Sequence, residues 1–214
     1  MQKSSKYFIK YEGAILLNSF KTFKRKISPW VYVYLKNTFY YDIIKNPLEP
    51  KRINRSKLID FFQISTRRIT YSLDDLEKNE LISKISKDHY YIVDESNYIE
   101  KCRSSLVERI DTKKVFFQMK YNFFFKYYPL ITNVGFSLYY YMMILNQHYL
   151  SPTKDTVLIP DNYFSIKRFC KEMNFTHRTV EPIIEKMTEL DIILFDQFGR
   201  YYTNSEKKIL SSNK

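Results

Sequence analysis

The chain has 214 residues, 44% of them apolar and 18% aromatic, so it can bury a packed core and global disorder is excluded. Its formal net charge is +12, and residues 1–100 and 101–214 each carry an excess of six basic residues. This charge indicates a polyanionic partner, either a nucleic acid or an anionic membrane surface.

The first predicted elements are a strand with a short turn in residues 6–17 and an aromatic helix in residues 30–44. Ser28, Pro29 and Trp30 open this helix, and Pro29 is expected at its first position, where a missing N–H costs nothing. These elements lead into the most informative segment of the first half.

That segment has the pattern of a helix-turn-helix. A short helix over about residues 56–62 ends at Gln63, the apolar Ile64 follows, and Ser65 is the predicted N-cap of a second helix. The second helix has apolar residues at helical spacing. They are Ile69, Leu73 and Leu76.

A β-hairpin is predicted directly after the second helix. Residues 84–95 alternate in polarity, with a turn at Lys87 and Asp88, and residues 97–112 are expected to be a linker or a short helix. Helix, turn, capped helix and hairpin is the order of a winged helix-turn-helix.

The second half repeats this pattern at a spacing of 111 residues, which aligns residues 56–82 with 167–193. Arg67 then matches Arg178, and the cap Ser65 matches Thr176. Five further elements are expected in this half. In chain order, they begin with a strand and short turn at 114–125 and an aromatic helix capped by Thr132 and Asn133. A helix at about 165–173 follows, then a second helix with Val180, Ile184 and Met187 inside, and a hairpin at 194–204 turning at Phe198 and Gly199.

The predicted fold is therefore mainly α with small β-hairpins (α+β), arranged as two tandem winged helix-turn-helix domains. The first domain is expected to span residues 1–96 and the second residues 113–214, with the linker 97–112 between them. Two helical hairpins that only pack or dimerise would give a similar pattern, and the sequence leaves that alternative open.

The second half also resembles a known family. Its motifs are FQMKYNFFF (117–125), an aromatic helix, SIKRFCKEMNFTHRTV (165–180) and LDII (190–193). This order resembles the N-terminal winged-helix domain of plasmid replication initiators and phage replisome organisers from low-GC Gram-positive bacteria. The family ends its helix-turn-helix in a Gly-Leu-Ile-like triplet, which Glu80-Leu81-Ile82 and Asp191-Ile192-Ile193 match without the glycine. The resemblance implies a replication factor that binds duplex DNA.

The candidate DNA contacts lie mainly at the start of each second helix, the end expected to enter the major groove. Arg67 and Arg178 are the candidates for reading guanine, with phosphate contact as the alternative for each. The other candidates in the two second helices are Ser65, Thr66, Arg68, Thr70 and Tyr71 in the first copy, and Thr176, His177, Thr179 and Glu181 in the second.

Phosphate contacts require only positive charge. Residues 21–57 hold ten Lys and Arg against two acids, and this basic segment brackets the first helix-turn-helix. The phosphate candidates in and beyond it are Arg52, Arg55, Lys57, Lys84, Lys87 and Arg200. The first copy is therefore expected to make the main DNA contact, whereas the acidic second copy favours protein contact or dimerisation.

No catalytic, metal or cofactor site is predicted. The three histidines lie far apart and have no cysteine at metal-ligand spacing. Asp74 and Asp75 are interpreted as a surface charge pair of a helix. With two cysteines, no apolar signal segment and no apolar run long enough to cross a bilayer, we expect a cytoplasmic protein without a membrane partner.

The sequence thus predicts a non-enzymatic, sequence-specific duplex DNA-binding protein, a replication initiation or maintenance factor of a plasmid, phage or mobile element. A transcriptional regulator, and a winged-helix protein-interaction module of a replisome or relaxosome, stay open as alternatives. A second copy of the chain and replication proteins are the further partners considered, and no small-molecule substrate is expected.

Overall fold

The chain forms two compact units. The central unit consists of residues 18–106, and the terminal unit of residues 1–17 together with residues 107–214. The computed structural model describes residues 8–12, 15–16, 22–93, 95, 98, 116–149, 164–195 and 201–204.

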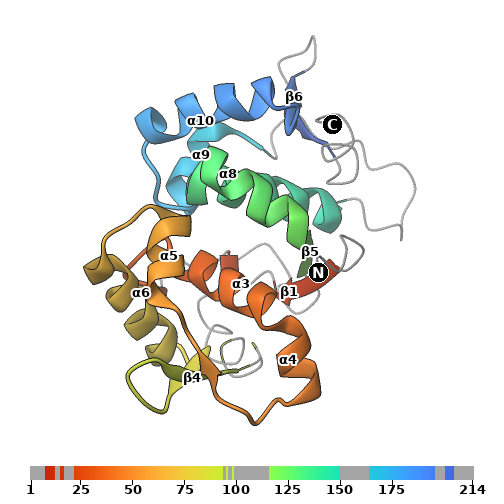
Figure 1. The fold of residues 1–214 in the computed structure, drawn as a ribbon. Helices are drawn as coiled ribbons and strands as arrows, with labels where there is room; N and C mark the ends of the chain where they lie inside the picture. Colours follow the sequence, from red (N-terminus) through yellow and green to blue (C-terminus); the bar gives the residue numbers. More distant parts are fainter. Residues whose placement is uncertain are drawn as a thin grey trace. The chain divides into compact units, whose positions relative to one another are not determined.

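The central unit contains four helices and three short strands in the part that the structure describes (Figure 1). They are α3 (Ser28–Thr38), α4 (Tyr40–Lys45), β2 (Lys51–Arg52), α5 (Arg55–Phe62), α6 (Thr66–Lys78), β3 (Ile82–Lys84) and β4 (His89–Ile92). α6 packs against both α3 and α5. The core between these helices is formed by side chains such as Trp30, Leu58, Ile69, Leu73 and Leu76, each at most 2% exposed.

The three strands of the central unit form one antiparallel sheet in the order β2–β4–β3. Lys51 is opposite Tyr90 where β2 meets β4, and Ile82 is opposite Ile92 where β3 meets β4. The strand that precedes α5 thus pairs with the far strand of the hairpin that follows α6. This pairing fixes the β3–β4 hairpin relative to the two helices.

The first helix of the central unit differs from its prediction. A single helix was expected over residues 30–44, but α3 ends at Thr38, and Phe39, with φ −103° and ψ 12°, separates it from α4. Pro29 is the second residue of α3 and not the first, because α3 begins at Ser28. The side chain of Ser28 does not cap the helix; its hydroxyl donates to the Asp75 carboxylate.

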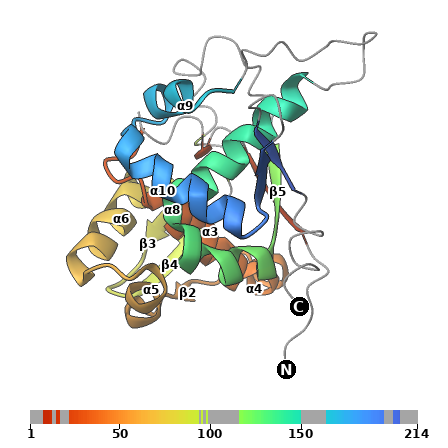
Figure 2. The same cartoon turned by 90° about the horizontal axis from the view of Figure 1, so that it is seen from above.

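The terminal unit places α10 along α8, with α9 and short strands around them (Figure 2). Its described elements are β1 (Phe8–Glu12), β5 (Phe116–Lys120), α8 (Tyr121–Tyr149), α9 (Ile166–Glu172), α10 (His177–Glu189), β6 (Ile193–Phe195) and β7 (Tyr201–Thr203). β1 pairs with β5 in antiparallel register and β6 with β7. The N-terminal strand, expected within the first module, is thus joined to the second half of the chain.

The segment around β5 and α8 corrects another prediction. A strand and a short turn were expected over residues 114–125, but the strand stops at Lys120 and a long helix, not a turn, begins at Tyr121. The rings of Phe123, Phe124 and Tyr127 explain this, because they recur at helical spacing and are all buried. Their contacts with one another and with rings of the second part of α8 form an aromatic core, in which Phe123 lies 5.4 Å from Phe136 between ring centroids.

The predicted cap at Thr132 is confirmed inside α8. Thr132 adopts φ 56° and ψ −171°, which interrupts the helix, and its hydroxyl oxygen accepts a hydrogen bond from the Val134 N–H at 3.4 Å. Pro129 lies within the helix just before this kink. α8 therefore consists of two helical pieces, the second being the aromatic helix that the sequence predicts.

The internal repeat is visible in the backbone. Gln63 and Asn174, 111 residues apart, both end a helix with left-handed φ values of 51° and 52°. Glu80 and Asp191, at the same spacing, have φ values of 58° and 53° at the end of the second helix of each copy. Glycine adopts such a φ without steric cost, whereas both of these positions hold an acidic residue.

Within the described residues the protein is mainly helical, with seven α-helices and three small antiparallel sheets. The prediction of an α+β class is thus confirmed at that level. None of the helices among these residues combines the length and the apolar character that crossing a bilayer requires.

Candidate nucleic-acid interface

The turn between α5 and α6 is built by local side-chain bonds. Asn54 caps α5 by accepting a hydrogen bond from the Lys57 N–H at 3.1 Å, and Gln63 ends α5 in the left-handed conformation. Ser65 then caps α6 by accepting from the Arg68 N–H at 3.4 Å, as the sequence predicts. These caps present the first turn of α6, with Thr66, to solvent.

α6 has one apolar and one polar face. Ile69, Leu73 and Leu76 are buried, which confirms the apolar face that their spacing predicts. Arg67 and Arg68 are exposed on the first turn, and Tyr71 is half-buried one turn later. The exposed side is therefore the side available to a partner.

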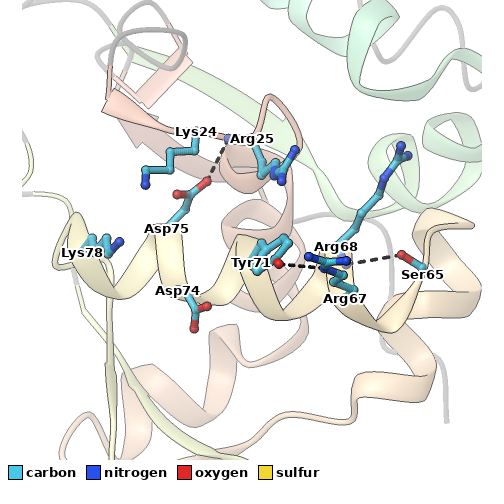
Figure 3. Close-up of a pocket in the computed structure, with 9 residues that line it drawn as sticks. All are labelled: Lys24, Arg25, Ser65, Arg67, Arg68, Tyr71, Asp74, Asp75 and Lys78. Atoms are coloured by element: carbon cyan, nitrogen blue, oxygen red, sulfur yellow. Dashed lines mark hydrogen bonds between the residues drawn. The ribbon is translucent and has the colours of Figure 1, made fainter.

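Two arginines converge on Tyr71 (Figure 3). The Arg67 Nε–H donates to the Tyr71 hydroxyl at 2.7 Å, and the Arg67 guanidinium carbon lies 5.3 Å from the centre of the Tyr71 ring. The guanidinium carbon of Arg25, which precedes α3, lies 5.2 Å from the same ring centre. Both distances are within the range of a cation–π interaction.

A buried carboxylate holds Arg25 beside Tyr71 on α6. Asp75 on α6 is 4% exposed and accepts hydrogen bonds from the Arg25 N–H at 2.9 Å and from the Ser28 hydroxyl at 3.0 Å. It therefore ties the start of α3 to α6. The interpretation of Asp74 and Asp75 as a surface pair is wrong for Asp75, because the chain folds back over it, whereas Asp74 is exposed and points away from Arg25 (Figure 3).

The result is a shallow groove along the exposed side of α6, which we call the α6 groove. Its basic and aromatic lining consists of Lys24, Arg25, Arg67, Arg68, Tyr71 and Lys78. Of the two acids that also line it, Asp75 is engaged with the start of α3. Five cationic side chains around one concave surface favour an anionic ligand.

Arg55 is engaged within the protein. Its guanidinium donates to Asp88 Oδ1 at 3.0 Å, to the Thr70 hydroxyl at 3.1 Å, to the Lys87 carbonyl at 2.9 Å and to the Tyr90 hydroxyl at 3.1 Å. It thus joins α5, α6 and the β3–β4 hairpin. Contact of Arg55 and Thr70 with DNA stays a prediction, but both side chains also serve to hold this hairpin in place.

The hydroxyl of Tyr90 is part of the same network. Burial raises the pKa of Tyr90, and the neighbouring Arg55 guanidinium acts in the opposite direction. The phenol therefore stays protonated at neutral pH and can accept the Arg55 hydrogen bond.

The other basic candidates of the central unit are exposed. Arg52 lies on β2, Lys57 on α5 and Lys84 on β3, while Lys87 is in the turn between β3 and β4. α5 and β3 contact α6, and β2 pairs with β4 in the same unit. The exposure of these side chains fits contact with a phosphate backbone, which stays a prediction.

The terminal unit presents a different surface on its second helix. Thr176 precedes α10 without a side-chain bond to the backbone, and its hydroxyl contacts that of Thr179 at 2.7 Å. His177 Nδ1 lies 2.9 Å from the Glu181 carboxylate. Arg178 is exposed, and Arg200 lies outside the described residues. Position for position, Pro182 here corresponds to Tyr71 of the central unit.

Sequence reasoning missed the contribution of Lys24 and Arg25 to the α6 groove. Their charge was noted as part of the basic segment, but nothing local shows that this segment returns to α6. A hydrogen bond between Arg67 and Tyr71, by contrast, could have been predicted, because residues four apart share one face of a helix.

The described residues contain no group of three or more His, Cys, Asp and Glu side chains suited to hold a metal ion. Comparison of the chain with models of protein families, with curated proteins and with solved structures finds no match.

Proposed function

We propose that this protein binds double-stranded DNA in a sequence-specific manner, without catalysis, chiefly through the central unit. In this proposal α6 enters the major groove with its N-terminal end first, and the β3–β4 hairpin lies beside the phosphate backbone as a wing. Lys24, Arg25 and Lys78 then contact phosphates.

The observation that carries the proposal is the convergence of Arg25 and Arg67 on Tyr71 in the α6 groove. Two guanidinium groups at one ring repel each other unless an anion balances them. A duplex supplies such anions at regular spacing along its backbone. The same helix face offers exposed side chains at its N-terminal end, where base contacts are made.

The order of elements supports a winged helix-turn-helix as the architecture. The central unit runs through α3, β2, α5, α6, β3 and β4 and has the sheet order β2–β4–β3. The left-handed residues at matching positions of the two units support a tandem arrangement of two such modules, the second containing α8, α9, α10, β6 and β7.

For the biological process we propose replication initiation or maintenance of a plasmid, phage or other mobile element. The support is the resemblance stated for the second half, together with the left-handed backbone at Glu80 and Asp191, where that family has glycine. A transcriptional regulator would use the same architecture. Repeated binding sites near an origin favour the first role, and a single palindrome in a promoter favours the second.

The terminal unit supports a second activity, contact with protein. Glu181, Glu185 and Glu189 are exposed along one side of α10 at a spacing of four residues. His177 lies beside Glu181 and Lys186 bonds Glu189 at 3.1 Å, and the row as a whole suits a basic protein surface better than a phosphate backbone. We propose a second copy of the chain or a replication protein as the partner of this surface.

The test compares two double variants that remove the same charge. Lys24→Ala/Arg25→Ala changes the α6 groove but keeps the Arg25 N–H that Asp75 binds, and Lys167→Ala/Lys171→Ala changes exposed positions of α9. Affinity for a labelled duplex from the flanks of the gene is measured against salt concentration. The slope of log K against log salt is negative, and we expect its magnitude to decrease by about two for the first variant and to stay unchanged for the second. Equal slopes for both variants would contradict the proposal.

A further inference from the structure

The hydrogen bond between Arg67 and Tyr71 determines which N–H donors of Arg67 remain available to a ligand. The Nε–H of Arg67 is used by the Tyr71 hydroxyl at 2.7 Å. In the part of the chain that the structure describes, no other hydrogen bond or ion pair involves the Arg67 side chain. The two terminal nitrogens, Nη1 and Nη2, therefore remain as a parallel pair of donors at the far end of the guanidinium.

That end of the side chain is at the right place for base contact. Arg67 is the second residue of α6 and is exposed. Guanine is the base that presents two acceptors, O6 and N7, side by side in the major groove. Two parallel N–H donors match these acceptors, whereas adenine presents one donor and one acceptor there.

Tyr71 is itself held in place. Its ring is half-buried and has the guanidinium groups of Arg25 and Arg67 at 5.2 and 5.3 Å from its centre. Arg25 is fixed in turn through its N–H to the buried Asp75. A guanidinium oriented by a fixed partner loses less conformational freedom when it binds.

Resting on the proposed function, we propose that Tyr71 is a positioning residue that orients Arg67 to read one guanine through O6 and N7. The inference concerns the central unit alone. In the terminal unit Arg178 corresponds to Arg67, but Pro182 stands at the position of Tyr71 and offers no hydroxyl. Arg178 is therefore not oriented in this way.

The experiment uses the full chain and a pool of duplexes with a randomised centre. Sequences that bind the unaltered chain are selected, and each dG of a selected site is replaced in turn by 7-deaza-dG, which keeps O6 but has C–H in place of N7. Affinities are measured for the unaltered chain, Tyr71→Phe, Arg67→Ala and the matched control Arg178→Ala. Tyr71→Phe removes only the hydroxyl and keeps the ring between the two arginines, and thermal unfolding checks that it is folded.

We expect one dG whose replacement weakens binding of the unaltered chain and of Arg178→Ala by about tenfold. The same replacement should change binding of Tyr71→Phe and Arg67→Ala less than about twofold, while the salt dependence of Tyr71→Phe stays that of the unaltered chain. The inference is overturned if binding of Tyr71→Phe stays fully sensitive to the 7-deaza-dG replacement, or if the effect of no dG replacement depends on Arg67. In both cases the chain still binds a selected sequence, so the proposed function stands. If the pool yields no sequence that binds above random competitor, the proposed function fails and the inference with it.

Discussion

The hydroxyl of Tyr32 on α3 donates a hydrogen bond at 2.9 Å to the carbonyl of Val93, the residue after β4. The terminal unit contains the same relationship, since the Tyr139 hydroxyl on α8 donates at 2.8 Å to the Asn204 carbonyl after β7. Val93 and Asn204 are 111 residues apart, the spacing of the repeat. The donors Tyr32 and Tyr139 are 107 residues apart, so the acceptor position repeats while the donor lies one helical turn away from the repeat register. In both units a tyrosine hydroxyl of an aromatic helix thus holds the far end of the hairpin.

These two hydroxyls give the first prediction. Tyr32→Phe and Tyr139→Phe should each lower the free energy of unfolding by about 1 kcal/mol, because the half-buried Val93 carbonyl and the buried Asn204 carbonyl lose their donors while the rings still pack. Chemical denaturation measures the change. Tyr121→Phe is the matched control, since Tyr121 is 45% exposed. A loss as large in the control as in the other two would show that the hydroxyl bonds contribute nothing specific.

Much of the segment from α5 to α6 could be predicted because its signals are local. Ser65 lies directly before the helix it caps, and Ile69, Leu73 and Leu76 lie on one face within two turns. The caps and apolar faces follow from neighbours a few residues away, and the structure has them where the spacing places them.

The remaining features depend on residues distant in the sequence. β1 pairs with β5, with Ile9 opposite Met119. Both strands are short and aromatic, so the sequence of neither one indicates which strand it pairs with. The burial of Asp75 depends on the return of Arg25 and Ser28 over α6, and a carboxylate on a helix is usually exposed. For the same reason the contribution of Arg25 to the α6 groove could not be predicted.

The buried carboxylate of Asp75 gives the second prediction. Asp75→Ala should lower the free energy of unfolding by about 2 kcal/mol, because the Arg25 N–H and the Ser28 hydroxyl lose their acceptor in a buried place. Asp74→Ala, one residue earlier and exposed, should change it by less than about 0.5 kcal/mol. Thermal and chemical unfolding of both variants test this, and similar losses would mean that Asp75 does not anchor α3.

The left-handed residue after α10 gives the third prediction. Asp191 has φ 53°, a conformation that costs an L-residue about 1 kcal/mol or more and glycine little. Asp191→Gly should therefore leave stability unchanged or raise it by up to about 1 kcal/mol, although glycine loses more entropy on folding. Glu185→Gly, in the middle of α10, should lower stability by about 1 kcal/mol. If Asp191→Gly destabilises as much as Glu185→Gly, the backbone at 191 is not left-handed.

The last prediction concerns the hydrogen bonds by which Arg55 holds the β3–β4 hairpin. Arg55→Lys keeps the charge but cannot bond Thr70, Lys87, Asp88 and Tyr90 together, because an ammonium has three donors on one nitrogen, whereas the guanidinium has five spread over three nitrogens. We expect hydrogen exchange of the Ile85 N–H, which bonds to the His89 carbonyl at 2.9 Å, to speed up about tenfold. Arg52→Lys, at an exposed position of β2, is the control and should leave this exchange rate unchanged. Exchange that is equally slow in Arg55→Lys would show that strand pairing alone orders the hairpin, without a contribution from the Arg55 guanidinium.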